Sequence, residues 1–413
     1  MASSEPIIKH EESQYEEVET DEMMEKAPWR RFTKEEWTEI YKILKTLKTG
    51  SLSPFFEVLE RHFEVKDRMG FTIVLACAVA HQVPGEMVWL RIYGASRSGK
   101  TELLKAIARH NDSTEMEAIT PASIRGGLKG GHQLLKRING KLVITKDLAT
   151  ILTAKREARN EVFGLLRGVK DGKLTADFGI EEKEGYISQE VKFDWLIGTT
   201  PAFAQYRQME DLLGARYVDL NWKTGNREEM AFRALENNPH MDMIRQELAK
   251  AVGELIDRAK RQYKIKVHEK RFELLERDKK LIADWADLTA LLRSPVARDR
   301  YHGVKFHPEP EVGTDLAQGF RKISGGLSLL GIYDYERYLG RLACDSIPYS
   351  RREIIKKLVT DGKISVTDRK TPSTTYYELE DMRLLGIVEL VVDRDWRIKP
   401  QLRARIGILA GYF

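Results

Sequence analysis

The chain has 413 residues, enough for two or three domains, and 42% hydrophobic with 32% charged residues is a globular composition. It contains no run of about 18 uncharged apolar residues and no basic-then-apolar leader, so we expect neither a membrane span nor export, but a cytoplasmic protein. The two cysteines, Cys77 and Cys344, each lie in an apolar stretch and are predicted to be core thiols of a reducing compartment.

The formal net charge of +5 is distributed unevenly. Residues 1–27 contain nine acids and two lysines, a net of −7, so the remainder carries +12. Few large apolar residues occur in residues 1–30, which we therefore expect to form a disordered acidic tail. The basic remainder is compatible with a polyanion such as nucleic acid, although a similar charge is also common on proteins that bind none.

Helical and strand-like patterns alternate along the middle of the chain. Residues 33–82 have helical spacing and include an apolar helix, Phe71–Ala80. The elements expected next are a buried strand Met87–Tyr93, a glycine loop, a helix Glu102–Arg109, a strand Lys141–Thr145, a helix 157–169, a hairpin 173–192 turning around Lys183–Gly185, and a buried strand Phe193–Gly198. This alternation over residues 87–222 predicts an α/β fold with a parallel, doubly wound sheet.

The remainder of the chain reads as helices followed by a small mixed unit. Residues 226–295 and 311–345 are expected to be mostly helical. In the last unit we expect helices at Ile354–Val359 and Leu379–Leu385, strands at Ile387–Val392 and Trp396–Ile398, and a tight turn between the strands. We therefore expect five regions: the acidic tail (1–30), an N-terminal helical region (31–84), the α/β core (85–225), a second helical region (226–345) and the small C-terminal unit (346–413).

One motif carries a specific chemistry. The run Gly94, Ala95, Ser96, Arg97, Ser98, Gly99, Lys100, Thr101 fits the pattern G-x-x-x-x-G-K-[ST]. Its glycines allow a tight turn that presents backbone N–H groups to phosphates, Lys100 reaches the β- and γ-phosphates, and Thr101 offers a hydroxyl to Mg²⁺. The flanking strand and helix favour this interpretation over a chance Gly-Lys-Thr turn. Arg97 is either a phosphate contact or a solvated side chain.

Two further strand ends supply candidate catalytic groups. A phosphate loop of this kind works with acids at the end of a second strand, and here only Asp147 follows the strand Lys141–Thr145, beside Lys146. Asp147 either holds the metal or activates the attacking water, and a helix N-cap is the structural alternative. Thr200, after the third strand, is the candidate for holding that water, against a plain Thr-Pro turn.

These motifs, in this order, resemble an AAA+ ATPase core, and most of all the minichromosome-maintenance-like helicases of phages and mobile elements. The resemblance covers residues 70–345 and identifies a Walker A loop at Gly94–Thr101, a Walker B strand at Leu142–Asp147, a DNA-gripping hairpin that starts in Asp171–Ile180, sensor 1 at Thr199–Pro201, an arginine finger at Arg216 in Leu212–Tyr217, and, within a lid at 226–345, the sensor-2 region at Glu311–Asp315. It implies a P-loop NTPase core with a helical lid. The lid lacks the sensor-2 arginine expected near Thr314, and Arg321 is the nearest substitute.

Candidate DNA contacts lie in three places. The unit 346–413 resembles a winged helix, whose Arg369, Lys370 and Arg394 are possible phosphate contacts, unless the unit serves protein contact or lid packing. Lys183 lies near the expected hairpin tip, but three glutamates flank it. Lys129 lies in the glycine-rich loop Ser123–Gly131, which faces a central pore or is a mobile linker.

Together these features predict a ring-forming ATP-dependent DNA motor, a replicative helicase of a phage or mobile element. ATP and Mg²⁺ are its expected cofactors. The expected partners are DNA, further copies of the chain in a hexameric ring, and other replication proteins bound through the acidic tail. The alternative is an ATP-switched helicase loader or nucleoprotein assembly scaffold with weak hydrolysis, which the single acid at Asp147 favours.

Overall fold

The computed structural model describes residues 52–125, 133–148, 154–180, 183–200, 217–268, 276–366, 374–391 and 394–413. Contacts divide the chain into Met1–Thr49 and Gly50–Phe413, and every described residue belongs to the second unit. None of the helices in these ranges is both long and apolar enough to cross a membrane. The predicted tail and four candidate site residues lie outside the described ranges: Lys129, Arg216, Arg369 and Lys370.

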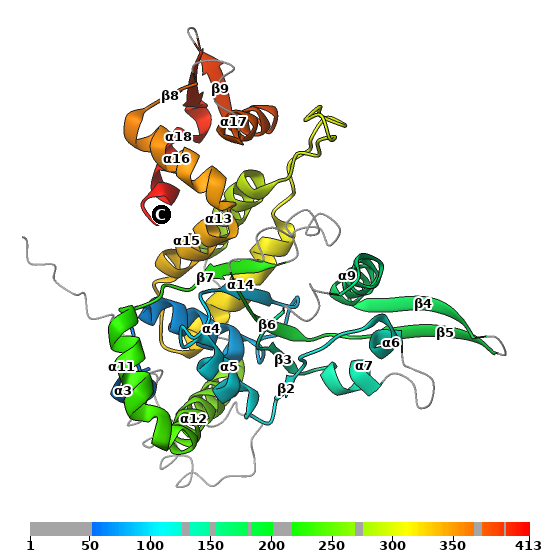
Figure 1. Cartoon of the computed structure of the whole chain (residues 1–413), viewed down its shortest axis with the longest axis vertical. Coiled ribbons are helices and arrows are strands. Elements are labelled where there is room, and N and C mark those ends of the chain that lie inside the picture. The colour runs from blue at the N-terminus through cyan, green and yellow to red at the C-terminus, as the bar shows by residue number, and fades with distance from the viewer. Residues whose placement is uncertain are drawn as a thin grey trace, which may run out of the picture. The chain divides into compact units, whose positions relative to one another are not determined.

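The centre of the structure is a five-stranded sheet in which all pairings are parallel (Figure 1). Its strands are, in sheet order, β2 (Ser113–Glu115), β3 (Leu142–Thr145), β6 (Asp194–Thr199), β1 (Trp89–Tyr93) and β7 (Val218–Asn221). The three strands predicted in this region are confirmed as β1, β3 and β6, and the predicted parallel α/β sheet is confirmed with them. The two edge strands, β2 and β7, were not predicted individually.

Both faces of this sheet are covered, because alternate residues along each strand point to opposite sides. On one side Leu90 and Ile92 pack against α4 (Arg68–Ala80), α5 (Lys100–Ala108), α12 (Met241–His268) and α14 (Thr314–Leu329). On the other side Trp89 packs with residues of α6 (Pro121–Arg125), α7 (Gln133–Ile138) and α9 (Arg156–Lys170). Complete burial of a large apolar side chain contributes about 1.5–3 kcal/mol, so these two cores hold the sheet in place.

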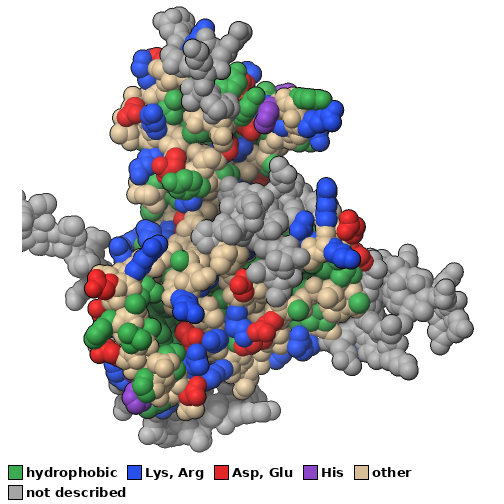
Figure 2. Space-filling view, in the orientation of Figure 1, with side chains coloured by type: hydrophobic (Ala, Val, Ile, Leu, Met, Phe, Trp, Pro, Cys, Tyr) green, Lys and Arg blue, Asp and Glu red, His purple; other side chains and the backbone are tan. Residues whose placement is uncertain are grey.

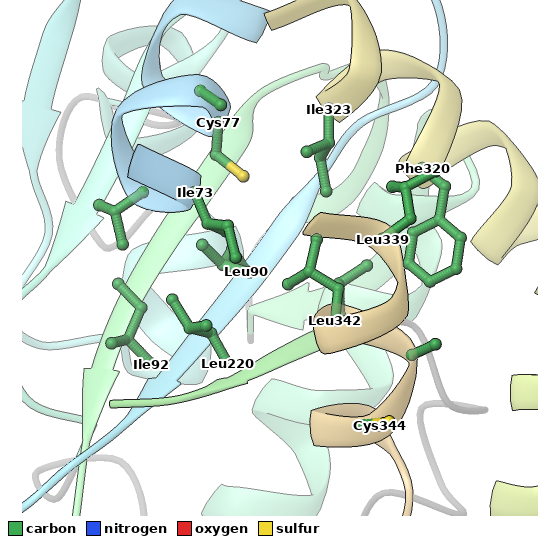
Figure 3. Close-up of a cluster of buried hydrophobic side chains, with 14 of the residues drawn as sticks. Ile73, Cys77, Leu90, Ile92, Leu220, Phe320, Ile323, Leu339, Leu342 and Cys344 are labelled. Carbon is green, nitrogen blue, oxygen red and sulfur yellow. The ribbon is translucent and has the colours of Figure 1, made fainter. Parts of the chain in front are cut away.

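The first core also contains both cysteines, as Figure 3 shows. Cys77 on α4 and Cys344 on α15 (Tyr335–Ser346) are free and buried, and burial raises the pKa of each thiol above its ordinary value. The prediction that both are core residues is confirmed.

A long hairpin lies between α9 and β6. Strands β4 (Lys173–Ile180) and β5 (Lys183–Glu190) pair antiparallel along their whole length and project beyond the sheet in Figure 1. The hairpin was predicted, but its turn was not placed correctly. Ile180 pairs with Lys183, so Lys183–Gly185 belong to β5 and the turn comes before them. The prediction of a glycine-rich loop at Ser123–Gly131 was also partly wrong, because Ser123–Arg125 belong to α6.

The remaining elements before the last unit are helical, as expected. They are α3 (Ser53–His62), α11 (Arg227–Asn237), a short 3-10 turn (Asn238–His240) and α13 (Glu276–Arg293), together with α12, α14 and α15. Helix α14 packs along α4, where Gly326 allows close approach: a Cβ built on it would lie 2.0 Å from the Ala76 carbonyl oxygen. Residues late in the chain therefore pack on α4, on the face of the sheet that carries Leu90 and Ile92.

The C-terminal elements form a small α+β unit, as predicted. They are α16 (Tyr349–Asp361), β8 (Ile364–Ser365), α17 (Thr374–Leu384), β9 (Val388–Val391), β10 (Asp395–Ile398) and α18 (Pro400–Ala410), and the strands form an antiparallel sheet in the order β8-β10-β9. Helix α18 was not predicted. Its proline at the first turn and its buried Leu402, Ile406 and Leu409, at spacings of four and three, are the signals that would have indicated it.

Candidate nucleotide site

The carboxyl ends of β1, β6 and β3 lie side by side at one edge of the sheet, because these neighbouring strands are parallel. The Gly94 N–H donates to the Thr199 carbonyl (3.2 Å), and the Leu148 N–H donates to the Gly198 carbonyl (3.1 Å). These two bonds place the phosphate-loop segment, Thr200 and Asp147 around the end of β6. The structure therefore brings together residues that sequence reasoning selected from three separate strands.

The loop Gly94–Thr101 contains two residues in the left-handed region of backbone conformation. Arg97 and Gly99 have positive φ angles of 62° and 86°, and Gly99 is the N-cap of α5. Positive φ is adopted readily by glycine and seldom by other residues. Ala95, Ser96 and Arg97 are exposed, so the loop opens to solvent while α5 directs the positive end of its dipole toward it.

Lys100 is 4% exposed, and its ammonium donates to the carbonyls of Gly94 (2.8 Å) and Ala95 (2.9 Å). Burial lowers the pKa of Lys100, and the charge of Asp147 opposes that effect. The cation is thus folded back on neutral carbonyls of its own loop. A phosphate group would replace these partners with an oppositely charged one.

Ser98 carries a second sign of an anion site. The residue is 7% exposed, and its Oγ has no hydrogen-bond partner among the described residues. A buried polar group left without a partner costs about 1–3 kcal/mol. An oxygen ligand placed in the loop would satisfy this hydroxyl.

Lys146 and Asp147 are consecutive but differ in their surroundings. Lys146 forms ion pairs with Glu115 (2.8 Å) and Glu117, whose hydrogen bonds raise the pKa of the lysine. Asp147 is exposed and interacts electrostatically with Lys100. The charge of Asp147 therefore acts on the loop lysine, whereas Lys146 is neutralised by two glutamates that sequence reasoning missed.

Thr101 and Asp147 are the protein oxygens available for Mg²⁺. Thr101 is the second residue of α5 and half-buried. One hydroxyl and one carboxylate fit a magnesium ion that takes its remaining ligands from phosphates and water, which is how Mg²⁺ is usually held in nucleotide sites. The residues present therefore fit the metal.

Trp222, just after β7, was missed by sequence reasoning. Its indole Nε1–H donates to the Ser98 carbonyl (2.9 Å) and its backbone N–H to the Tyr93 carbonyl (2.7 Å). A Cβ built on Gly94 would lie 2.8 Å from the Trp222 Cβ. The ring packs edge-on against Phe71 at 4.5 Å. Trp222 therefore fixes both ends of the phosphate-loop turn, and the alternating run 217–222 would have indicated the strand that carries it.

The residues beside Trp222 extend this support. The side chain of Asn221 donates to Asp345 (2.9 Å) on α15, and the Lys223 N–H donates to Asp67 (2.9 Å), the N-cap of α4. Arg341 on α15 donates to the Asn221 carbonyl (2.7 Å) and to Asp67 (2.7 Å). One buried network thus joins the end of β7, the start of α4 and helix α15.

The opposite edge of the sheet holds a different buried cluster. Asp194, at the start of β6, accepts hydrogen bonds from Lys322 (2.8 Å to each oxygen), pairs with His81 (2.8 Å) and accepts from the Val88 N–H (2.6 Å). Burial acts to raise the pKa of Asp194, but His81 and Lys322 bring it below its ordinary value. Lys170, at the end of α9, donates to the Met87 carbonyl. Both roots of the β4–β5 hairpin are therefore anchored here.

Three other predicted residues lie away from the loop. Arg321 is beside Gly85, before β1, since a Cβ built there would lie 3.3 Å from its Nη1. That is the amino end of the sheet, so Arg321 cannot act as a sensor at the phosphate loop of its own subunit. Lys183 begins β5 and Arg394 is exposed with a φ of 69° just before β10. No protein-family model matches this sequence, and no curated protein matches it either.

Proposed function

We propose that the chain is an ATP-dependent DNA motor that forms a ring, a helicase of a phage or mobile element, and that it hydrolyses ATP between subunits. The observation that carries the nucleotide part is the single sheet edge at which the loop Gly94–Thr101, Asp147 and Thr200 meet. In open α/β sheets, ligands bind outside the carboxyl ends of the strands, which is where these residues lie.

Each residue has a role in this proposal. The loop amides and Ser98 hold the phosphates, and Lys100 exchanges its two carbonyl partners for β- and γ-phosphate oxygens. Thr101 and Asp147 would hold Mg²⁺, which would supply positive charge to the phosphates when bound. Thr200 orients the attacking water. Because β6 lies between β1 and β3, Thr200 stands between the loop and Asp147, where a water attacking the γ-phosphate would be placed.

The ring and the arginine finger rest on the resemblance of the motif order. In the sequence Arg216 lies two residues before β7, the strand that leads to Trp222. In the proposed ring its guanidinium enters the nucleotide site of the neighbouring subunit and neutralises charge on the transferred phosphoryl group. The lid is the helical region from α11 to α15.

The DNA part is supported by the C-terminal unit and the long hairpin. A helix, a short strand, a second helix and a two-stranded hairpin follow one another in the order of a winged helix. The three acids of α17 are already paired with arginines: Glu378 with Arg351, Glu380 with Arg383, and Asp381 with Arg298. Pairing removes much of the repulsion that free carboxylates on this helix would exert on a phosphate backbone.

The proposal is tested by two substitutions in the full-length protein. Lys100→Ala should remove nucleotide binding, measured by calorimetry with a non-hydrolysable ATP analogue. Arg216→Ala should leave binding intact and lower ATP turnover by about 10³-fold or more if the arginine acts between subunits. Mixing the two inactive variants should restore part of the turnover, because mixed interfaces contain one intact site. Unwinding that survives both substitutions would refute the motor.

A second function, an ATP-switched loader or scaffold with weak hydrolysis, is favoured by the surroundings of β3. Lys146 is paired with Glu115 and Glu117 and is not available to the phosphate loop. Asp147 is the single carboxylate in the sequence directly after β3. A single carboxylate has to serve either the metal or the water. ATP turnover that single-stranded DNA does not stimulate severalfold would favour this second function over the motor.

A further inference from the structure

A small exposed hairpin follows helix α13 and is separate from the nucleotide edge. We call residues 297–307 the aromatic hairpin. The Lys305 N–H donates to the Ala297 carbonyl (3.0 Å), and the Asp299 N–H donates to the Gly303 carbonyl (2.8 Å). Arg298 and Val304 form an isolated antiparallel β-bridge between the two arms. Residues 299–307 are all exposed, whereas Pro308 after them is buried.

The tip of the aromatic hairpin has a defined shape. The Asp299 carboxylate accepts from the N–H groups of Tyr301 (2.7 Å) and Gly303 (2.8 Å). His302 has a φ of 64°, and a Cβ built on Gly303 would lie 2.9 Å from the Asp299 Oδ2. A non-glycine residue at positive φ persists only where its surroundings hold it. The tip is therefore specified by its own side chains.

The aromatic hairpin is also fixed to the C-terminal unit. The His302 ring stacks on Tyr377 of α17 at 4.4 Å with 15° between the planes. Arg298 donates to Asp381 (2.9 Å) and lies over the Tyr377 ring at 5.1 Å. Tyr376 lies next to Tyr377, 5.8 Å between ring centroids. The hairpin and the first half of α17 thus present one continuous surface.

Large apolar side chains on this surface face solvent. Tyr301 is 74% exposed, Phe306 64%, Val304 41% and Tyr376 41%. Figure 2 shows hydrophobic side chains next to basic and histidine side chains where Figure 1 places the hairpin. A fold gains nothing from holding several aromatic rings in water, and grouped exposed apolar residues mark interaction sites.

Basic side chains alternate with these rings. The Arg300 guanidinium lies 4.6 Å from the centre of the Tyr301 ring, and Lys305 lies between Val304 and Phe306 in sequence. In the part of the chain that the structure describes, neither Arg300 nor Lys305 forms an ion pair. The one acid of the hairpin, Asp299, is occupied by backbone N–H groups. The surface therefore offers uncompensated positive charge beside exposed aromatic rings.

We infer that the aromatic hairpin, with Tyr376, is a binding platform for single-stranded nucleic acid. Exposed rings stack on bases, and interleaved cations contact the phosphates between them, which is the pattern of sequence-tolerant single-strand binding. A duplex keeps its bases stacked on each other and would leave the rings of Tyr301 and Phe306 unused. The platform deepens the proposed motor function and rests on it. It gives the single-stranded DNA a contact that lies away from the nucleotide site.

The test uses the full-length protein and a labelled oligo(dT), followed by fluorescence anisotropy over a salt titration. Tyr301→Ala with Phe306→Ala should weaken binding about 30-fold or more, because removing a stacking ring usually costs about 1–3 kcal/mol per base and two rings are removed. Tyr301→Phe keeps the ring and should bind like the wild type. Tyr333→Ala, which removes a tyrosine elsewhere that is as exposed as Phe306 (64%), is the matched control and should also bind normally.

A direct readout of stacking comes from Tyr301→Trp, whose new fluorescence should be quenched when oligo(dT) is added. Wild-type affinity in the double alanine variant, or no quenching, would overturn the platform. A double variant that changes only the oligomeric state would instead assign the surface to protein contact and overturn it equally. Binding of an ATP analogue is measured in parallel. If it is normal while oligo(dT) fails to bind, the platform is wrong and the nucleotide site stands; if it is lost in the wild type, the proposed function fails by itself.

Discussion

Replacing Trp222 by phenylalanine tests how the phosphate loop is held in place. The substitution keeps an aromatic ring against Phe71 but removes the indole N–H that donates to the Ser98 carbonyl at 2.9 Å. That carbonyl is then left without its partner in a buried position, at a cost of about 1–3 kcal/mol. Because the bond fixes the loop that cradles the phosphates, we expect much of this cost to appear as weaker nucleotide binding.

The expected loss of affinity follows from that cost. About 1.4 kcal/mol corresponds to a tenfold change in an equilibrium constant, so the dissociation constant for an ATP analogue should rise about 5- to 100-fold. Calorimetric titration measures it, with urea unfolding of the same sample to show that the fold is intact. The matched control is Trp285→Phe, because Trp285 is equally buried and its Nε1 has no hydrogen-bond partner among the described residues.

The reasoning would be refuted by a Trp222→Phe protein that is folded and binds the analogue as tightly as the wild type. An equal loss of affinity in Trp222→Phe and Trp285→Phe would refute it as well, since it would show that general loosening of the core, rather than the bond to Ser98, weakens binding.

Three further predictions concern the sheet. A Cβ at Gly198 would lie 2.4 Å from the Lys146 carbonyl oxygen, so Gly198→Ala should cost about 1–3 kcal/mol of stability in urea unfolding and displace the loop after β3; an unchanged unfolding midpoint would contradict this. Burial lowers the pKa of Lys170 to about 8, so between about pH 8 and 10.4 the unfolded chain binds more protons than the folded one, and the Lys170 contribution to stability should rise with pH. Lys170→Met should remove this rise, which urea unfolding at several pH values measures. An equal dependence on pH in both proteins would exclude the effect. Arg91→Met should cost about 3–5 kcal/mol by leaving the buried Asp219 carboxylate unpaired, whereas adding Asp219→Leu should restore most of it; a double variant no more stable than the single one would argue against the ion pair.

The sequence predicted those parts of the fold that local patterns specify. Continuous apolar runs predicted β1, β3 and β6, and one motif placed the loop between β1 and α5. The short edge strand β2 was missed because Ser-Thr-Glu has no apolar pattern of its own. It is a strand only because it pairs with β3.

The site was predictable where spacing carried the chemistry and not where tertiary contacts did. The loop residues follow from one pattern, but the bond from Trp222 to Ser98 joins residues 124 apart. The pairing of Lys146 with Glu115 joins residues 31 apart and removes the lysine from the site, which a linear reading of Lys146-Asp147 does not show. Arg321 illustrates the same limit, since its helix runs past the sheet and delivers it to the opposite edge.

The buried pair of Arg91 and Asp219 also has a consequence for synthesis of the chain. The two residues are 128 positions apart, and at about 5–20 residues per second the ribosome needs about 6–26 s to pass from one to the other. For most of that interval β1 lacks both of its neighbours, because β6 ends only at Thr199 and β7 follows it in the chain. A charge in the middle of an apolar strand discourages wrong pairing with another chain. Arg91 therefore protects the nascent strand, and its charge is withdrawn from solvent only when Asp219 is made and pairs with it.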